Sequence, residues 1–216
     1  MVMDFLEAWR EAEPYTMLGA ERGRVLWDTV TEVTAGCFYG AIAELGVYRG
    51  GTALLLRRAA PGYHLHLFDT FTGHPDGSRA HDIAASQPRG RFGDVALSRV
   101  IELLEPTLPI GMGVGRSGLT IHAGIFPDTL RHAALPMLRF VHVDCDLYDS
   151  VAAACRIFWP ALEHGGVLLF DDYGFPDCVG AKRAVDEWAA IDPELRELHL
   201  ATDGHTLTGQ AWVRKP

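Results

Sequence analysis

A glycine-rich turn between an apolar stretch and a helical stretch is the feature that most limits what this chain can fold into. Ala41-Ile42-Ala43 leads into Glu44-Leu45-Gly46-Val47-Tyr48-Arg49-Gly50-Gly51-Thr52, and a helical pattern follows over 53–58. Strand, tight turn and helix in this order form the first unit of a nucleotide-binding α/β sheet. Glycines let a backbone approach a ligand closely, and a helix N-terminus adds oriented N–H groups. The same turn can also be purely structural.

The spacing of the glycines separates two classes of cofactor. The turn reads Gly46-x-x-x-Gly50-Gly51, which differs from the dinucleotide fingerprint G-x-G-x-x-G. Glu44 stands at the strand end, where a carboxylate would repel a pyrophosphate and attract a cationic or amine-bearing ligand. S-adenosylmethionine (SAM) carries an ammonium and a sulfonium group and no phosphate. The turn therefore favours SAM over NAD.

Length and composition predict one domain over residues 1–216. The 216 residues are 48% hydrophobic, which is enough for one sizeable core. The net charge of −9 argues against general nucleic-acid binding, which needs a basic face. The N-terminus lacks the features of a signal peptide, and no apolar run approaches the length of a membrane span. Cys37, Cys145, Cys155 and Cys178 show no C-x-x-C spacing and are expected to be free thiols. These features predict a cytoplasmic protein without a membrane partner.

The order of periodic segments predicts an α/β fold with a mostly parallel sheet. A helical cap over 1–35 (helices 1–13 and 20–34, with Phe5, Leu6 and Trp9 on one stripe of the first) precedes an α/β core over 36–216. Expected strands and helices alternate through this core, and the tail reads as an antiparallel hairpin at a sheet edge. The expected strands are 41–44, 64–69, 119–124, 138–144, 167–170, 197–200 and 209–213, and the helices between them are 53–58, 95–106, 127–131, 150–163 and 179–191.

Two stretches between these elements are rich in turn-forming residues. Residues 70–94 have little periodicity, and a loop this long inside a compact domain is usually functional, so we interpret it as a lid on the substrate side. Gly111–Gly118 is a second stretch expected to be flexible.

Acidic residues follow four of the five parallel strands. Ligands of open α/β sheets bind at the carboxyl ends of strands. The residues expected there are Glu44, Asp69, Gly124, Asp144 with Asp146, and Asp171 with Asp172. So many carboxylates repel one another unless a cation joins them, and both the SAM cation and a hard divalent metal would serve. Asp69 has the position that holds ribose hydroxyls, although Asp can also cap a turn. The other acids can likewise cap helices or pair with arginines.

Six motifs together resemble one known family. They are Glu-Leu-Gly-Val-Tyr-Arg-Gly-Gly at 44–51, Phe-Asp-Thr-Phe at 68–71, Phe-Gly-Asp at 92–94, Gly-Ile-Phe-Pro-Asp-Thr-Leu at 124–130, Val-Asp-Cys-Asp-Leu-Tyr at 143–148, and Gly165-Gly166 up to Asp171-Asp-Tyr173. The combination resembles the macrocin O-methyltransferase family from about Thr16 to Trp212. The resemblance implies a Rossmann-like class I SAM-dependent methyltransferase with a seven-stranded sheet. It also implies Mg²⁺ (or Mn²⁺) and a hydroxyl acceptor on a sugar or another natural product such as an antibiotic.

The resemblance also assigns roles to single residues of this chain. Glu44, Gly46, Tyr48 and Thr52 would hold the methionine part of SAM, and Thr16 and Met17 would close over it. Asp69 would bind the ribose, and Gly124 with Ile125 would flank the adenine. Asp144, Asp171 and Asp172 would bind the metal, with Asp144 also near the cofactor. Catechol O-methyltransferases share the Glu-Leu-Gly-x-Tyr pattern, but their basic lysine is replaced by Leu147 here.

A base must take the proton from the acceptor hydroxyl. Asp144 is the first choice because it lies at the expected metal, and His142 is a second catalytic candidate whose expected role is packing or a hydrogen bond. Asp146 would be a base or a substrate contact. Two other hypotheses stay open from the residues alone: a SAM- or nucleotide-binding module without catalysis, and an NAD-dependent oxidoreductase. The acceptor is expected to be a small molecule, but the residues do not specify which one. The choice of a hydroxyl over an amine as the methylated group follows from the resemblance alone. The residues leave open whether the chain forms a homo-oligomer.

Overall fold

A computed structural model describes residues 3–36, 40–77, 80–84, 86–108, 118–133, 135–191, 198–202 and 207–216. The stretch expected to be flexible, up to residue 117, lies outside these ranges, as do Cys37 and Glu197. Within the described part, no helix combines the length and the apolar character that crossing a membrane requires.

The centre of the molecule is a sheet of seven strands in the order β3-β2-β1-β4-β5-β7-β6. The strands are β1 (Ala41–Leu45), β2 (Leu65–Asp69), β3 (Leu119–Ala123), β4 (Leu138–Val143), β5 (Leu162–Phe170), β6 (His199–Thr202) and β7 (Leu207–Arg214). The first five are parallel, whereas β7 runs antiparallel to both β5 and β6. This confirms the predicted α/β fold with a mostly parallel sheet and a C-terminal antiparallel hairpin.

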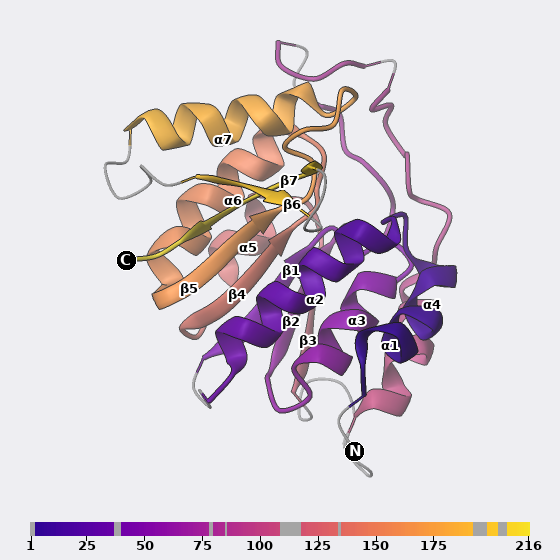
Figure 1. Ribbon diagram of the computed structural model, residues 1–216. Coiled ribbons are helices and arrows are strands. Elements are labelled where there is room, and N and C mark those ends of the chain that lie inside the picture. The colour runs from indigo at the N-terminus through magenta and orange to yellow at the C-terminus, as the bar shows by residue number, and fades with distance from the viewer. Residues whose placement is uncertain are drawn as a thin grey trace.

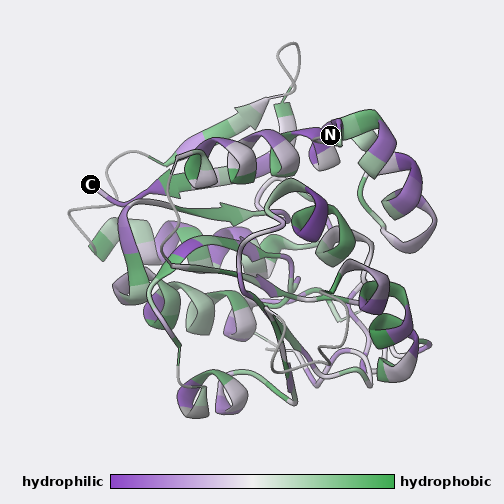
Figure 2. Ribbon diagram, turned by 90° about the horizontal axis from the view of Figure 1, so that it is seen from below, coloured by the Kyte–Doolittle hydropathy of each residue, from purple (hydrophilic) through white to green (hydrophobic). Residues whose placement is uncertain are grey.

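Helices cover both faces of the sheet (Figure 1). One layer holds α1 (Phe5–Ala12), α2 (Ala20–Thr34), α3 (Gly51–Ala59) and α4 (Leu97–Leu104), whose buried side chains share one apolar cluster with the sheet. The other layer holds α5 (Asp128–His132), α6 (Tyr148–Ala161) and α7 (Val179–Ile191). Two short 3₁₀ helices follow α1 and α4, at Glu13–Tyr15 and Glu105–Thr107. Helices that carry both green and purple patches in Figure 2 show the amphipathic pattern that such layers need.

The two helices expected near the N-terminus pack on the sheet and contribute to its core. Leu26 and Val30 of α2 have no exposed surface and pack in the same cluster as Phe140 of β4. The helix predicted over 1–13 is shorter: it begins after Asp4, whose side chain forms a capping box with Glu7.

The expected apolar stripe of this first helix is wrong at one position. Leu6 is 59% exposed, whereas Ala8 and Ala12 are buried beside Phe5 and Trp9. Small side chains at these positions let α1 pack closely on its neighbours. The buried face of α1 therefore contains two alanines, which the pattern of large apolar side chains does not reveal.

The fifth strand begins earlier than the apolar run 167–170 predicted. Strand β5 starts at Leu162, which pairs with Leu138, and the register shifts before Val167 pairs with Phe140. Gly165, expected to form a turn, has φ +75° within this irregular part of the strand. A glycine accommodates that left-handed backbone without steric cost. The glycines that predicted a turn therefore form an irregularity inside a longer strand.

The alternation of side chains along the strands decides where the acids point. Phe140 of β4 and Leu169 of β5 pack toward the layer that holds α2 and α3. Asp144 and Asp171 share their parity and follow the same strands, so both carboxylates lie on the α2 side of the sheet at its carboxyl edge. The fold therefore gathers the acids on one side of one edge.

Candidate active site

A cavity of about 270 Å³ opens at the carboxyl edge of the sheet. It lies among the turn after β1, the loop after β2, the ends of β4 and β5, and the segment between α1 and α2. The predicted site residues that line it are Thr16, Met17, Gly46, Tyr48, Thr52, Asp69, Asp144, Asp146, Asp171 and Asp172. The structure thus brings most of the predicted cofactor and metal residues into one cavity.

The glycines of the turn are required by close approaches of backbone to backbone. A Cβ on Gly46 would lie 1.6 Å from the carbonyl oxygen of Asp144, and one on Gly51 would lie 2.6 Å from the carbonyl carbon of Tyr15. Gly46 and Gly50 also have φ values of +84° and +86°. The turn therefore packs directly on the end of β4, and the segment between α1 and α2 crosses directly over the start of α3.

Asp69 holds this turn in shape. Its Oδ2 accepts hydrogen bonds from the backbone N–H groups of Val47 (2.7 Å) and Tyr48 (3.0 Å), and its Oδ1 accepts one from Phe71 (2.7 Å). The capping role weighed for this residue is therefore present in the structure. Asp69 also lines the cavity, so the predicted ribose contact stays a prediction that is compatible with this geometry.

Glu44 and His142 form a buried pair behind the cavity. The two residues are partners in the β1–β4 register, neither has exposed surface, and His142 Nδ1 lies 3.1 Å from Glu44 Oε1. Burial alone would lower the pKa of His142, but Asp171 and Glu44 raise it to about 10. Neither residue lines the cavity, so His142 has the hydrogen-bonding role that was expected first and no access to a substrate.

The predicted adenine contacts lie outside the cavity. Gly124 follows β3, where its N–H donates to the carbonyl of Asp69, and Ile125 is 52% exposed. Neither lines the cavity, whereas the next residue, Phe126, does. An apolar ring at this position is the feature of the motif that reaches the site.

The acids after β4 and β5 form a tight cluster. One carboxylate oxygen each of Asp144, Asp171 and Asp172 lies within 4.8 Å of the other two. Burial and repulsion from Asp171 and Asp172 raise the pKa of Asp144 well above its usual value. Burial and repulsion from Asp146 and Asp171 do the same to the pKa of Asp172. His142 favours the charge of Asp144 and Arg22 that of Asp172, but burial and repulsion outweigh both.

Asp171 differs from its two neighbours because cationic and polar groups surround it. Arg22 of α2 forms an ion pair with its Oδ2, and Gln210 Nε2 of β7 donates to its Oδ1 at 2.7 Å. Although burial opposes ionisation, His142 and Arg22 hold the pKa of Asp171 below its usual range. One ionised carboxylate beside two destabilised ones is a donor set that fits a hard divalent cation.

A family model, macrocin-O-methyltransferase (TylF), matches residues 7–202. The chain belongs to this family. A sequence relative from Streptomyces olivaceus, an 8-demethyl-8-(2,3-dimethoxy-alpha-L-rhamnosyl)-tetracenomycin-C 4'-O-methyltransferase, is 28% identical over 175 residues, which cover 76% of this chain and 64% of the relative. The chain thus spans less than two thirds of that protein's length.

Two further proteins agree with the family assignment. A demethyldecarbamoylnovobiocin O-methyltransferase from Streptomyces niveus is 28% identical over 192 residues, 83% of this chain and 69% of the relative. The solved structure of the O-methyltransferase NovP superposes with a TM-score of 0.77 at 25% identity, over 93% of this chain and 82% of that one. The macrocin-O-methyltransferase fold therefore extends over nearly the whole chain.

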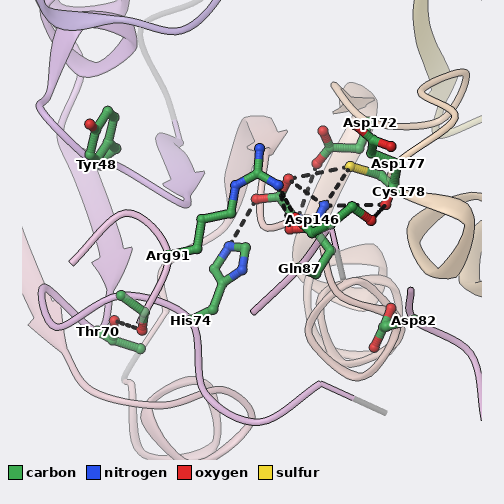
Figure 3. A network of polar contacts seen from close by, with 12 residues as sticks. Tyr48, Thr70, His74, Asp82, Gln87, Arg91, Asp146, Asp172, Asp177 and Cys178 are labelled. Carbon is green, nitrogen blue, oxygen red and sulfur yellow. Dashed lines mark hydrogen bonds and ion pairs between the residues drawn. The ribbon is translucent and has the colours of Figure 1, made fainter. Parts of the chain in front are cut away.

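Several residues of the cavity were not predicted from the sequence. Arg22 lies in a helix with no motif, and His74 and Arg91 lie in the loop after β2, which carries no periodic signal. Figure 3 shows both loop residues around Asp146, together with Gln87 of the same loop and Cys178, which directly precedes α7. For the loop residues, the sequence offered one indication of a role in the site: they are polar or cationic side chains in a loop that was expected to cover it.

Proposed function

We propose that this macrocin-O-methyltransferase family member transfers a methyl group from SAM to a hydroxyl of a sugar or another small natural product, with Mg²⁺ or Mn²⁺. The observation that carries the proposal is the cluster of Asp144, Asp171 and Asp172 in the same cavity as the glycine turn. An oxygen-only donor set selects hard cations, and the turn suits a ligand without phosphate. The names of the relatives support oxygen as the acceptor atom.

The cofactor would occupy the β1–β2 side of the cavity. Gly46 and Tyr48 of the turn and Thr52 in the first turn of α3 would contact its methionine part, with Thr16 and Met17 above them. Asp69 would reach the ribose with the lone pairs that its backbone hydrogen bonds leave free. The methyl group on the sulfonium is the chemistry that SAM supplies. Glu44 would act from behind the turn rather than touch the cofactor directly.

The metal would be held by Asp144, Asp171 and Asp172. The raised pKa values of Asp144 and Asp172 indicate that a bound cation would relieve repulsion that the protein itself leaves in place. Bound there, the ion would lower the pKa of a coordinated acceptor hydroxyl and fix its direction.

The acceptor would enter from the side of the loop after β2 and the segment before α7. Met17 and Phe175, which are 63% and 38% exposed, line the cavity and give its mouth an apolar character. Leu147, 2% exposed, stands where catechol O-methyltransferases have a lysine, so no lysine would serve as the base at this position, and a carboxylate would take the proton instead. Asp144 remains the predicted base, and Asp146, which lines the cavity beside the cluster, would contact the acceptor hydroxyl.

Methyl transfer from labelled SAM tests this proposal. The purified chain would be incubated with methyl α-L-rhamnopyranoside, a dTDP-linked deoxyhexose and a catechol, each with Mg²⁺ and each with EDTA. We expect SAM to bind under both conditions and a methyl ether to form only with the metal. Absence of SAM binding under both conditions would remove the proposal, and equal turnover in EDTA would remove its metal.

A further inference from the structure

The carboxylate of Asp146 is held by the loop that follows β2. His74 Nε2 lies 3.1 Å from Asp146 Oδ2, and both side chains are largely buried. On the other oxygen, Cys178 Sγ lies 3.3 Å from Oδ1, and Gln87 Nε2 reaches the same oxygen at 3.5 Å. Figure 3 shows His74 and Gln87 approaching Asp146 from the loop, while Cys178 approaches from the segment directly before α7.

The backbone of Asp146 is also fixed. Its φ of +57° lies in the left-handed region, which non-glycine residues seldom adopt, and its N–H donates to Asp172 Oδ2 at 3.0 Å. That conformation places the side chain beside the acid cluster and against the loop. An uncommon backbone conformation held by specific hydrogen bonds is typical of a functional position.

The part of the loop that carries His74 is braced. The N–H of His74 donates to the carbonyl of Arg91 (2.8 Å), and the N–H of Gly90 donates to the carbonyl of His74 (2.9 Å). A Cβ on Gly73 would lie 2.5 Å from the carbonyl oxygen of Gly90, so the two ends of the loop meet at van der Waals contact. His74 therefore lies where residues 73–74 contact residues 90–91 and close the base of the loop, which we call its neck.

The neck also connects the two sides of the cavity. The ring of His74 packs edge-on against Phe92 (5.2 Å between ring centroids), and Phe92 packs in the same way against Tyr48 (5.0 Å). Tyr48 belongs to the cofactor turn and Asp146 to the acceptor side. Contacts between Tyr48, Phe92, His74 and Asp146 therefore connect the cofactor side of the cavity with the acceptor side.

The direction of the hydrogen bond between His74 and Asp146 follows from the chemistry of the two groups. A carboxylate oxygen accepts, so Nε2 of His74 is the donor. Nδ1 is buried without a hydrogen-bond partner among the described residues. His74 therefore acts on Asp146 as a donor from a single nitrogen.

From these contacts we propose that His74 is a positioning residue, which holds the Asp146 carboxylate in the orientation needed to accept a hydrogen bond from the acceptor hydroxyl. The loop after β2 then does more than cover the cavity: its neck completes the acceptor site. This inference rests on the proposed methyl transfer, because it assigns Asp146 to the acceptor.

Kinetics of four variants test the proposal, with the acceptor that the wild-type chain methylates fastest in the panel above. His74→Ala should lower kcat/KM for this acceptor by about 10²-fold, the loss expected when a reacting group is misplaced by about 1 Å. His74→Gln, which can still donate to Asp146, should recover most of it. His74→Ala should cost nothing further in an Asp146→Ala background, and all variants should keep the wild-type affinity for SAM.

His81→Ala is the matched control. It removes a histidine from the same loop, but this ring stacks on Tyr148 and does not line the cavity. It should keep kcat/KM within about twofold, well below the loss expected for a misplaced reacting group. An equal loss in His81→Ala, or additive losses at His74 and Asp146, would overturn the proposal.

A measurement that needs no acceptor separates this inference from the proposed function. In ¹H–¹⁵N spectra of the imidazole rings, with the His74 signals assigned by His74→Gln, wild-type protein should show a hydrogen held on Nε2. Asp146→Ala should mix the two tautomers. The same tautomer in both proteins would contradict the contact. If no acceptor in the panel is methylated, the proposed function fails on that panel while the spectra still decide the role of His74.

Discussion

The two halves of the cavity floor use acids in opposite ways. After β2, Asp69 is supplied with partners by the protein itself: three backbone N–H groups donate to its carboxylate. After β4 and β5, Asp144 and Asp172 face other carboxylates, and the pKa of each is raised well above its usual value. The same residue type at the same sheet edge thus stabilises one half and destabilises the other.

This difference indicates what each half contributes to function. The β1–β2 half is preformed, because Asp69 fixes the turn on which a cofactor would lie. The β4–β5 half stores repulsion that a cation would relieve, so its stability and its ligand affinity are linked. Substitutions in the first half should act mainly on folding, and substitutions in the second mainly on chemistry.

The largest expected effect is the loss of activity when the cation cluster is broken. Asp144→Ala and Asp171→Ala should each lower kcat/KM for methyl transfer by about 10²-fold or more, since even outer partners of metal ligands are worth about 10–100-fold. Asp149→Ala, on the exposed first turn of α6, is the matched control. Full activity of the two cluster variants with EDTA present would erase the contrast between the halves.

The second effect concerns folding in the other half. Asp69→Ala removes the acceptor of three backbone N–H groups and should lower the free energy of unfolding by about 2–4 kcal/mol, as partly buried donors lose their partner. Asp69→Asn keeps one oxygen and should lose less. Urea unfolding monitored by fluorescence gives both values. A loss in Asp69→Ala below the loss in Asp144→Ala would reverse the comparison.

The third effect is the pH dependence of metal affinity. Because the pKa values of Asp144 and Asp172 are raised, each carboxylate keeps its proton to higher pH than a free aspartate does, and a metal must displace it. Metal affinity should therefore rise with pH, by up to about tenfold per pH unit for each proton released. Titrations in buffers of different ionisation enthalpy count the protons. An affinity that is flat over the range between the free and the raised pKa values would argue against the cluster.

The smallest effect is a gain in stability. The raised pKa of Asp172 means that the folded state binds its proton more tightly than the unfolded state. Its contribution to stability therefore falls as pH rises from the ordinary aspartate value toward the folded value. Asp172→Asn should raise the stability of the metal-free protein at pH 7 by about 1 kcal/mol, a typical gain where function has cost stability. A lower Tm for this variant than for wild type would contradict this prediction, because it would mean that the charge of Asp172 does not destabilise the metal-free fold.

The sequence was sufficient where function depends on position along a strand. The order of elements placed Asp144, Asp171 and Asp172 at neighbouring strand ends, and strand alternation put two of them on the same side of the sheet. The glycine turn and Asp69 were likewise found from local spacing. These features were predictable because strand periodicity and turn spacing involve only residues that are close together in the sequence.

Contacts between segments far apart in the chain were not predictable. Arg22 meets Asp171 only because α2 crosses the sheet, and His74 meets Asp146 only because the loop folds back on its own neck. The pairing of Glu44 with His142 depends in the same way on how β1 and β4 align. Such pairings depend on packing, for which a single sequence has no periodic signal.

The most direct test of the central claim is the binding of Mn²⁺, measured by the loss of its free electron paramagnetic resonance signal. Wild-type protein with S-adenosylhomocysteine should bind one ion, which Mg²⁺ displaces, while Asp172→Asn with the same cofactor should leave the signal of free Mn²⁺ unchanged. Equal binding by the two proteins, or binding by neither, would contradict the account that the repelling half of the cavity is built for a cation.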